Sequence, residues 1–573
     1  MSAAKRVEKR LDLVLLWHMH QPDYRDYTTG EFRLPWVYLH AIKDYTDMAW
    51  HLEHHSGVRV VVNFAPVLLD QLEDYADQFA NGRLRDPLLR LLARAEGEPF
   101  SEEERHFILQ RCFHANHEQM IQPYPVYEGL HELFTMLEAR GPDSLHYLSD
   151  QYLFDLITWY HLCWTGESVR RSSEIVTRLM TKGAQFSHID RMELFKLIGE
   201  MVSGIITRYA KLAASGRIEL STTPHHHPLA PLLISFGSAL EAEPRMELPQ
   251  SPEYPGGYER IESQLRLAIT EHSRRFGEAP AGVWPAEGAI SSAFLGLLGA
   301  QGCKWTASGE KVLMNSLRGS EEDPRRTLYR PYRHVATAPD LALFFRDDRL
   351  SDLIGFEYAK WNGRDAAVNF VSELEAIASG AADGETPLVS VILDGENCWE
   401  YYAYNGYYFL DELYRLFESH PLICTTTYRA YLGQATTGAA ALERIIAGSW
   451  VFGNFTTWMG SADKNRAWDF LCAAKRSFDL VIASGRLDQE QARAAYRQLA
   501  ACEASDWFWW LGDYNPRFAV TSFDQLYRDD LSNLYRLLNL PVPDDLAHPI
   551  SHGSGHPEAG GAMRRAAESA QGA

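Results

Sequence analysis

The stretch Pro387-Leu388-Val389-Ser390-Val391-Ile392-Leu393-Asp394-Gly395-Glu396-Asn397 passes from a short strand-like run directly into polar side chains. Other short apolar runs end in the same way: Leu11 to Trp17 before His18, Val58 to Phe64, Arg217 to Thr223 before His225, and Ala281 to Trp284 before Glu287. Long helical patterns separate these runs, and that alternation is typical of a parallel α/β barrel. Because the carboxyl ends of barrel strands meet at one mouth, the polar clusters are expected to converge there.

One complete strand-loop-helix-strand unit can be followed in the sequence. Ser291 and Ser292 are suited to cap a helix that continues through Leu298, and Gly302 is suited to end it. The run from Cys303 to Ala307 then resembles the next strand. This unit supports the barrel prediction.

The helical patterns divide the chain unevenly. Residues 1–425 are predicted to form an incomplete parallel (β/α)7-type barrel, with a mainly helical insertion near 70–215 where strand signals are scarce. Residues 426–547 are predicted to form a C-terminal helical domain that contributes to the cleft. The remainder, 548–573, is rich in Gly, Ala, His and Ser and is predicted to be disordered.

Composition excludes some classes of partner. The 573 residues include 55 Lys plus Arg against 76 Asp plus Glu, a net charge of −21, and no long basic stripe offsets this charge. Nucleic acids and anionic membranes are therefore not expected as partners. A neutral polymer such as a glucan carries no charge that the acidic protein would repel.

Cysteine usage and hydropathy predict a soluble cytoplasmic protein. The seven cysteines are scattered and contain no C-x-x-C pair, so reduced and mostly buried thiols are expected. The charged segment Met1 to Arg10 runs into a strand-like segment too short for a secretion signal. No apolar run approaches the roughly 20 residues that a membrane helix needs. The sequence does not indicate an oligomeric state.

Two strand-end carboxylates have the properties that glycosidic bond cleavage requires. One carboxyl group must protonate the leaving oxygen while a second attacks or stabilises the positively charged sugar carbon. Glu287 follows Trp284, and Asp394 precedes Trp399, so both acids lie beside rings that shift carboxyl pKa values and stack on sugars. The alternative is that these acids form salt bridges, as many strand-end acids do.

Aromatic residues are frequent around these acids. Trp450 and Trp458 lie in Gly448-Ser449-Trp450-Val451-Phe452-Gly453-Asn454-Phe455-Thr456-Thr457-Trp458, and Asp506 precedes four more aromatic residues. Their faces can stack on the C–H faces of sugar rings, although most tryptophans in a chain of this size pack in the core. The segment from Glu503 to Trp510 is either a wall of the cleft or a seam between the helical unit and the barrel.

The histidines allow a rival hypothesis. His18-Met19-His20-Gln21-Pro22 and His225-His226-His227-Pro228 both follow strands, and alternate residues at a strand end can bind one metal ion. A metal-dependent deacetylase or amidohydrolase would use His18, His20, and His226 or His227 with Asp394. Neutral imidazoles can equally donate hydrogen bonds to sugar hydroxyls. Arg346, in the run from Phe344 to Arg349, is suited to orient the nucleophile or to lower its pKa.

Taken in order, these motifs resemble glycoside hydrolase family 57. The resemblance covers roughly residues 10 to 540 and rests on H-x-H-Q-P at His18 to Pro22, H-H-P at His226 to Pro228, W-x-x-E at Trp284 to Glu287, D-G-E-N at Asp394 to Asn397, and G-N-F-T-T-W at Gly453 to Trp458. It implies an incomplete (β/α)7 barrel, Glu287 as nucleophile and Asp394 as general acid and base of a retaining reaction. It also implies that neither a metal ion nor another cofactor is needed. The expected substrate-binding set is His18, His20, His226, Trp284, Arg346, Trp399, Trp450, Trp458 and Asp506.

The resemblance leaves the activity open among several possibilities. The W-E-Y-Y sequence after D-G-E-N is most similar to the α-amylase and amylopullulanase members, which favours hydrolysis of α-1,4 glucosidic bonds, with α-1,6 bonds as a further substrate. A 4-α-glucanotransferase or a branching enzyme would use the same acids with a sugar as acceptor. A glucan-binding protein without turnover is a further alternative.

Overall fold

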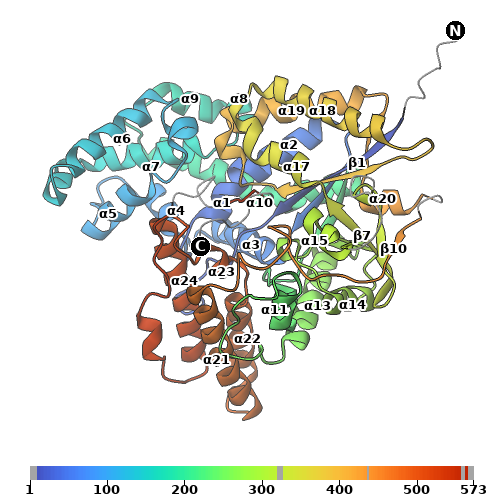
Figure 1. Ribbon diagram of the computed structural model, residues 1–573. Helices are drawn as coiled ribbons and strands as arrows, with labels where there is room; N and C mark the ends of the chain where they lie inside the picture. The colour runs from blue at the N-terminus through green and yellow to red at the C-terminus, as the bar shows by residue number, and fades with distance from the viewer. Residues whose placement is uncertain (1–8, 319–326, 435–437, 556–561, 566–573) are drawn as a thin grey trace, which may run out of the picture.

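The computed structural model describes residues 9–318, 327–434, 438–555 and 562–565 (Figure 1). Within these residues, seven parallel strands form a curled sheet in the order β7-β5-β4-β3-β2-β1-β8. They are β1 (Leu11–Met19), β2 (Val60–Phe64), β3 (Ile218–Thr222), β4 (Gly282–Val283), β5 (Trp305–Gly309), β7 (Ala338–Arg346) and β8 (Leu388–Asp394). The predicted incomplete (β/α)7 barrel is confirmed.

Three short strands extend this sheet. β6 (Tyr332–His334) pairs antiparallel with β7, β10 (Ala440–Leu442) pairs with β6, and β9 (Ile423–Thr425) pairs with β1. The two outer barrel strands meet at one point, where the Asp347 N–H donates to the Ser390 carbonyl at 2.8 Å. This contact brings the end of β7 next to β8, so the mouth is enclosed although the barrel is incomplete.

Alternation along the strands explains why their sequences are almost continuously apolar. In β1, Val14 and Leu16 pack inside the barrel, whereas Leu13, Leu15 and Trp17 face the surrounding helices. Successive side chains of a strand point to opposite faces, and here both faces are buried. In β1 the polar residues Asp12 and His18 therefore lie near its two ends.

Helices cover the outside of the barrel. The expected helix after Ser291 is present as α14, and Ser291 accepts a hydrogen bond from the Phe294 N–H. The helices around the barrel are α1 (Trp36–His40), α2 (Thr46–His54), α11 (Ala230–Ile234), α12 (Ala239–Ala242), α13 (Gly257–Phe276), α14 (Ser292–Ala300), α15 (Glu310–Ser316), α17 (Asp348–Asp352), α18 (Gly363–Gly380), α19 (Tyr407–Ser419) and α20 (Tyr428–Leu432).

A set of helices lies between β2 and β3 and projects to one side of the barrel (Figure 1). It comprises α3 (Pro66–Asn81), α4 (Pro87–Leu92), α5 (Glu102–Arg111), α6 (Pro125–Glu138), α7 (Asp150–Cys163), α8 (Glu167–Ser172), α9 (Glu174–Lys182) and α10 (His188–Ala214). Capping boxes at Ser101 and Ser187 begin two of these helices. These helices correspond to the mainly helical insertion that the sequence predicted near residues 70–215.

The C-terminal part is helical, as expected, and packs beside the barrel (Figure 1). Its helices are α21 (Ala462–Ala483), α22 (Gln489–Cys502), α23 (Asp506–Trp510) and α24 (Arg517–Leu537). Glu503, just after α22, is buried and accepts two hydrogen bonds from Arg260 of α13. Glu503 therefore belongs to a seam between these helices and the barrel.

The last residues are only partly described. Ile550 and Ser551 are buried, and so is Met563, whereas the sequence predicted disorder throughout 548–573. Residues 556–561 and 566–573, for which disorder was also predicted, lie outside the described residues. All seven cysteines are free thiols, and all but Cys424 are fully buried. Within the described ranges, no helix combines the length and the apolar character needed to cross a membrane.

Candidate active site

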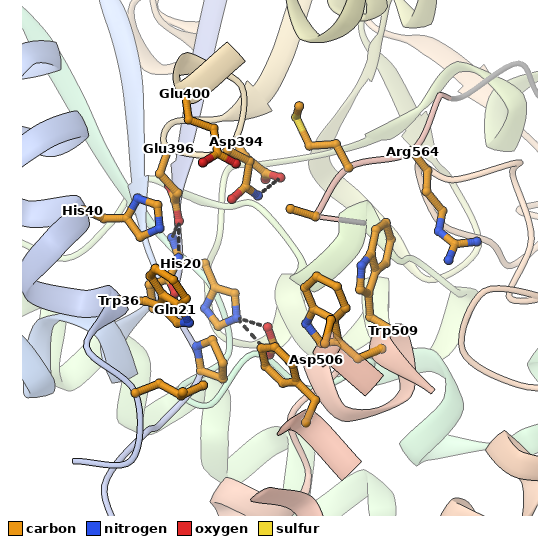
Figure 2. Close-up of a pocket in the computed structure, with 18 of the residues that line it drawn as sticks. His20, Gln21, Trp36, His40, Asp394, Glu396, Glu400, Asp506, Trp509 and Arg564 are labelled. Atoms are coloured by element: carbon orange, nitrogen blue, oxygen red, sulfur yellow. Dashed lines mark hydrogen bonds and ion pairs between the residues drawn. The ribbon is translucent and has the colours of Figure 1, made fainter. Parts of the chain in front are cut away.

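A cavity of about 510 Å³ lies at the carboxyl ends of the barrel strands. Its lining comes from the ends of β1, β7 and β8, the segments after β3 and β4, α1, the helical insertion and the C-terminal helices, among other segments. Figure 2 shows part of this lining. Of the predicted site residues, the cavity is lined by His18, His20, Glu287, Arg346, Asp394, Trp450 and Asp506. Residues separated by almost the whole chain therefore meet at one site, as strand-end clustering predicted.

The backbone of Glu287 is held in an unusual conformation. Glu287 has φ +58° and ψ +21°, in the left-handed region that L residues other than glycine rarely adopt. The Trp450 N–H donates to the Glu287 carbonyl at 3.0 Å and fixes this turn. A Cβ at the next residue, Gly288, would lie 2.7 Å from the Trp284 ring, so the turn has no room for a larger residue there. Such strain costs on the order of 1–3 kcal/mol and is common at functional sites.

The carboxyl group of Glu287 has a specific partner for each oxygen. The Ser505 hydroxyl donates to Oε1 at 3.0 Å, and the Trp450 indole N–H donates to Oε2 at 3.2 Å. Burial, and after it the negative charges of Asp506 and Asp394, raise the pKa of Glu287 to about 8, although these two hydrogen bonds lower it. The group is thus oriented and its proton affinity is high.

Asp394 ends β8, directly beside His18 in the register of β1 and β8. The Asn397 amide donates to its Oδ2 at 2.8 Å, within the D-G-E-N motif. Burial raises the pKa of Asp394 to about 6, while the hydrogen bond from Asn397 and the nearby His20 oppose that increase. A carboxyl group with this pKa can both give and take a proton near neutral pH.

Three histidines form a stack on the wall of the cavity. The rings of His20 and His227 are 3.7 Å apart, and His18 Nε2 lies 3.0 Å from His227 Nε2. Burial lowers the pKa of His18 to about 3 and that of His227 well below its usual value. These two imidazoles are therefore neutral at pH 7.

His20 connects the stack to Asp506. Its Nε2 lies 3.0 and 2.9 Å from the two carboxylate oxygens of Asp506, as the dashed lines in Figure 2 show. His20, His227 and Asp506 have ligand atoms within 4.8 Å of one another. The metal hypothesis named His20 and, as one alternative, His227, but it combined them with His18 and Asp394, which are not members of this group, and did not include Asp506. His227 Nδ1 also pairs with the Ser505 hydroxyl at 2.9 Å, so protein partners already engage both of its nitrogens.

Arg346 acts differently from the sequence-based expectation. Its guanidinium lies 5.0 Å from the centre of the Trp450 ring and pairs with Asp352 at 2.9 Å. Its positive charge lowers the pKa of Asp394, whereas the causes that shift the pKa of Glu287 do not include it. Arg346 therefore supports the wall of the cavity through Trp450 and does not pair with the predicted nucleophile.

Four predicted substrate-binding residues do not line the cavity. Trp284, Trp399 and Trp458 are at most 1% exposed and pack in the core, and His226 is 5% exposed with its Nδ1 at 3.0 Å from His225 Nδ1. Direct sugar contact was therefore the wrong expectation for these four in this structure. Trp284 still shapes the site, because its ring packs against Trp450 at 5.3 Å.

Several residues of the site were not predicted. His227 takes the place expected for His226, and Ser505 reaches Glu287 from just before α23. The insertion and the C-terminal helices add an aromatic wall: Phe113, Trp164, Trp509, Trp510 and Phe518. Only the W-F-W-W run offered a sequence signal for part of this wall, because the insertion carries no motif that points to the cavity.

The fold and the site define an enzyme that acts on glycosidic bonds, with two carboxyl groups in an aromatic cavity at the mouth of a (β/α)7-type barrel. The model of glycosyl hydrolase family 57 matches residues 14–440, and the chain belongs to this family. No curated protein sequence matches the chain at a significant level.

Three solved structures share the fold at low sequence identity. The chain is similar to a family 57 branching enzyme from Thermococcus kodakaraensis, with a TM-score of 0.55, 15% identity, and coverage of 93% of this chain and 90% of that chain. A branching enzyme from Pyrococcus horikoshii matches at a TM-score of 0.54 and 16% identity over 98% and 99% of the two chains. An α-amylase from Thermotoga maritima matches at a TM-score of 0.53 and 14% identity over 94% and 95%.

The hydrogen bond from Trp450 to Glu287 leads to a prediction. Trp450→Phe keeps a ring against Trp284 but removes the N–H donor, so kcat is expected to fall about 10- to 100-fold with little change in KM. Trp458→Phe is the matched control, because the Trp458 Nε1 has no partner among the described residues and the ring lies outside the cavity lining. Steady-state kinetics of both variants test this, and equal losses would contradict a role of the indole N–H.

Proposed function

We propose that the chain is a retaining α-glucan hydrolase that cleaves α-1,4 glucosidic bonds by double displacement. Glu287 attacks the anomeric carbon while Asp394 protonates the departing glycosidic oxygen, so a glycosyl-enzyme ester forms and the aglycone leaves. Asp394 then removes a proton from water, which attacks the anomeric carbon and releases Glu287. The observation that carries this proposal is that both carboxyl groups line one cavity from separate strand ends.

The lining of the cavity supports a sugar polymer as substrate. Trp450, Trp509 and Trp510 present rings that can stack on sugar C–H faces, and Arg346 and His20 supply polar contacts. The solved structures with the same fold are described as branching enzymes and an α-amylase, which act on α-glucans. An α-glucan is therefore the substrate class we infer.

The second candidate is transfer of the glycosyl group to a sugar, as in a 4-α-glucanotransferase or a branching enzyme. The observation that favours it is the aromatic wall: Phe113 and Phe518 line the cavity from segments other than those that carry the acids. A second glucan chain seated there would compete with water for the glycosyl-enzyme. Hydrolysis remains the first candidate because of the W-E-Y-Y sequence after D-G-E-N.

Amylose incubated with the purified protein distinguishes these activities. Hydrolysis is expected to create one new reducing end for each bond cleaved, with the α anomer as the first product by proton NMR. Transfer would redistribute chain lengths at a constant number of reducing ends, and branching would add α-1,6 anomeric signals. A β anomer as the first product would contradict the retaining mechanism, and pullulan as a parallel substrate tests α-1,6 cleavage.

A further inference from the structure

A second cluster of histidines and carboxylates lies on the outer helices of the barrel. His51 in α2, His55 just after α2, and Asp411 in α19 have ligand atoms within 4.8 Å of one another. None of the three lines the cavity. The two helices run next to each other in Figure 1, and His51 and His55, four residues apart, reach the same side of α2.

His51 has no partner for either ring nitrogen among the described residues, although its side chain is fully buried. The rings of Tyr407 and Tyr414 lie 5.2 and 6.3 Å from it. Burial lowers its pKa to about 3, so the imidazole is neutral and carries a free lone pair. A buried polar nitrogen without a partner is costly, and a coordinated cation would remove that cost.

His55 is arranged as metal-binding histidines usually are. Its Nε2 lies 3.2 Å from Asp411 Oδ1, and its Nδ1 lies 3.1 Å from Glu418 Oε2. The Gly57 N–H donates to the other oxygen of Glu418 at 2.7 Å and holds this carboxylate in place. A ligating histidine commonly donates its second N–H to such a carboxylate, which fixes the ring and its tautomer.

The simpler explanation is an ion pair without a metal. His55 between Asp411 and Glu418 has a partner for each of its own nitrogens. An ion pair alone would leave the two nitrogens of the buried, neutral His51 unexplained. A divalent cation would coordinate one nitrogen of each histidine, including one of the two that have no partner in His51, and its charge balances the two carboxylates.

We propose that His51, His55 and Asp411 bind a divalent transition-metal ion, with zinc preferred, and that Glu418 orients His55. Two imidazoles and one carboxylate form a known zinc ligand set, and a water molecule would complete the tetrahedron at the solvent-facing side, where Asp411 is 41% exposed. The ion would join α2, which follows β1, to α19, which follows β8. These are the strands that carry His18 and Asp394, so the role is to brace the barrel and not to take part in catalysis.

The test must separate this site from His20, His227 and Asp506, which can also attract zinc. The full chain carrying Asp506→Asn is freed of metal with a chelator and titrated with zinc chloride by calorimetry. One equivalent is expected to bind. Adding Asp411→Ala is expected to weaken binding at least about 100-fold, and Glu418→Gln about 10- to 100-fold.

Glu375→Gln is the matched control, because Glu375 pairs with a single histidine, His420, at 3.2 Å outside the cluster. It should bind zinc as the Asp506→Asn parent does. The thermal midpoint of the parent should rise with zinc, and the midpoint of the Asp411→Ala variant should not. Absence of zinc binding in the parent, or binding that Asp411→Ala leaves unchanged, would overturn the proposal.

Discussion

Glu287→Gly is expected to lose at least about 10³-fold of kcat on a maltooligosaccharide while remaining folded with a thermal midpoint close to that of the wild type. The activity is lost because no carboxylate remains to attack the anomeric carbon. The fold is preserved because glycine adopts the observed φ of +58° without strain, which offsets the loss of the hydrogen bonds from Ser505 and Trp450. Kinetics and a thermal melt measure the two effects.

Azide separates the role of Glu287 from that of Asp394. The substrate is an aryl α-maltooligoside, whose leaving group needs no proton. In the Glu287→Gly variant, azide can occupy the space left by the missing side chain. It should then attack the anomeric carbon directly and yield the β-glycosyl azide. In Asp394→Gly, azide should instead attack the glycosyl-enzyme and yield the α-glycosyl azide. Glu287→Gln serves as the isosteric control. An α-azide from Glu287→Gly, or wild-type turnover of Glu287→Gln, would contradict the assignment.

The second large effect is expected in the pH dependence of kcat/KM. Asp394 with a pKa of about 6 and Glu287 with a pKa of about 8 predict a bell-shaped profile with limbs near these values. Between these two pH values, the pair of carboxyl groups holds a single proton, mainly on Glu287. The reaction needs that proton on Asp394. Since the two values differ by about two units, roughly one molecule in a hundred of the singly protonated form is productive.

Asp394→Asn tests this assignment of the proton. On the aryl α-maltooligoside, the variant needs only an ionised Glu287, so activity should rise with pH and then level off. The rise should lie below pH 8, because the Asp394 charge that raises the pKa of Glu287 is removed. A profile that still falls at high pH would show that Asp394 is not the group that supplies the proton.

The strands were predictable because each is a short apolar run buried on both faces. His18, next to the end of β1, pairs with Asp394 at the end of β8, so two sequence motifs predicted one location. α14 and its Ser291 cap were also predictable, because helix capping depends on residues that are neighbours in the sequence. The two acids therefore emerged from local sequence alone.

Side-chain direction was not predictable where tertiary contacts decide it. His226 and His227 follow the same strand, but His227 adopts φ +58° and turns its ring toward His18 and His20. The W-x-x-E and D-G-E-N motifs each contribute an acid to the cavity, yet Trp284 and Trp399 pack beneath it. The sequence around an aromatic residue does not show whether its ring lines the cavity, where it can stack on a sugar, or packs in the core.

The sequence by itself determined the barrel class, the strand-end acids Glu287 and Asp394, and their position at one mouth, because strand and helix periodicity are local and parallel strands end on one side. Only the tertiary structure decided that Ser505 holds Glu287 and that Asp506 holds His20. The residues of each pair lie hundreds of positions apart, and their contacts depend on how the C-terminal helices pack on the barrel. The packing of α19 against α2 on the outside of the barrel likewise brings Asp411 to His51 and His55.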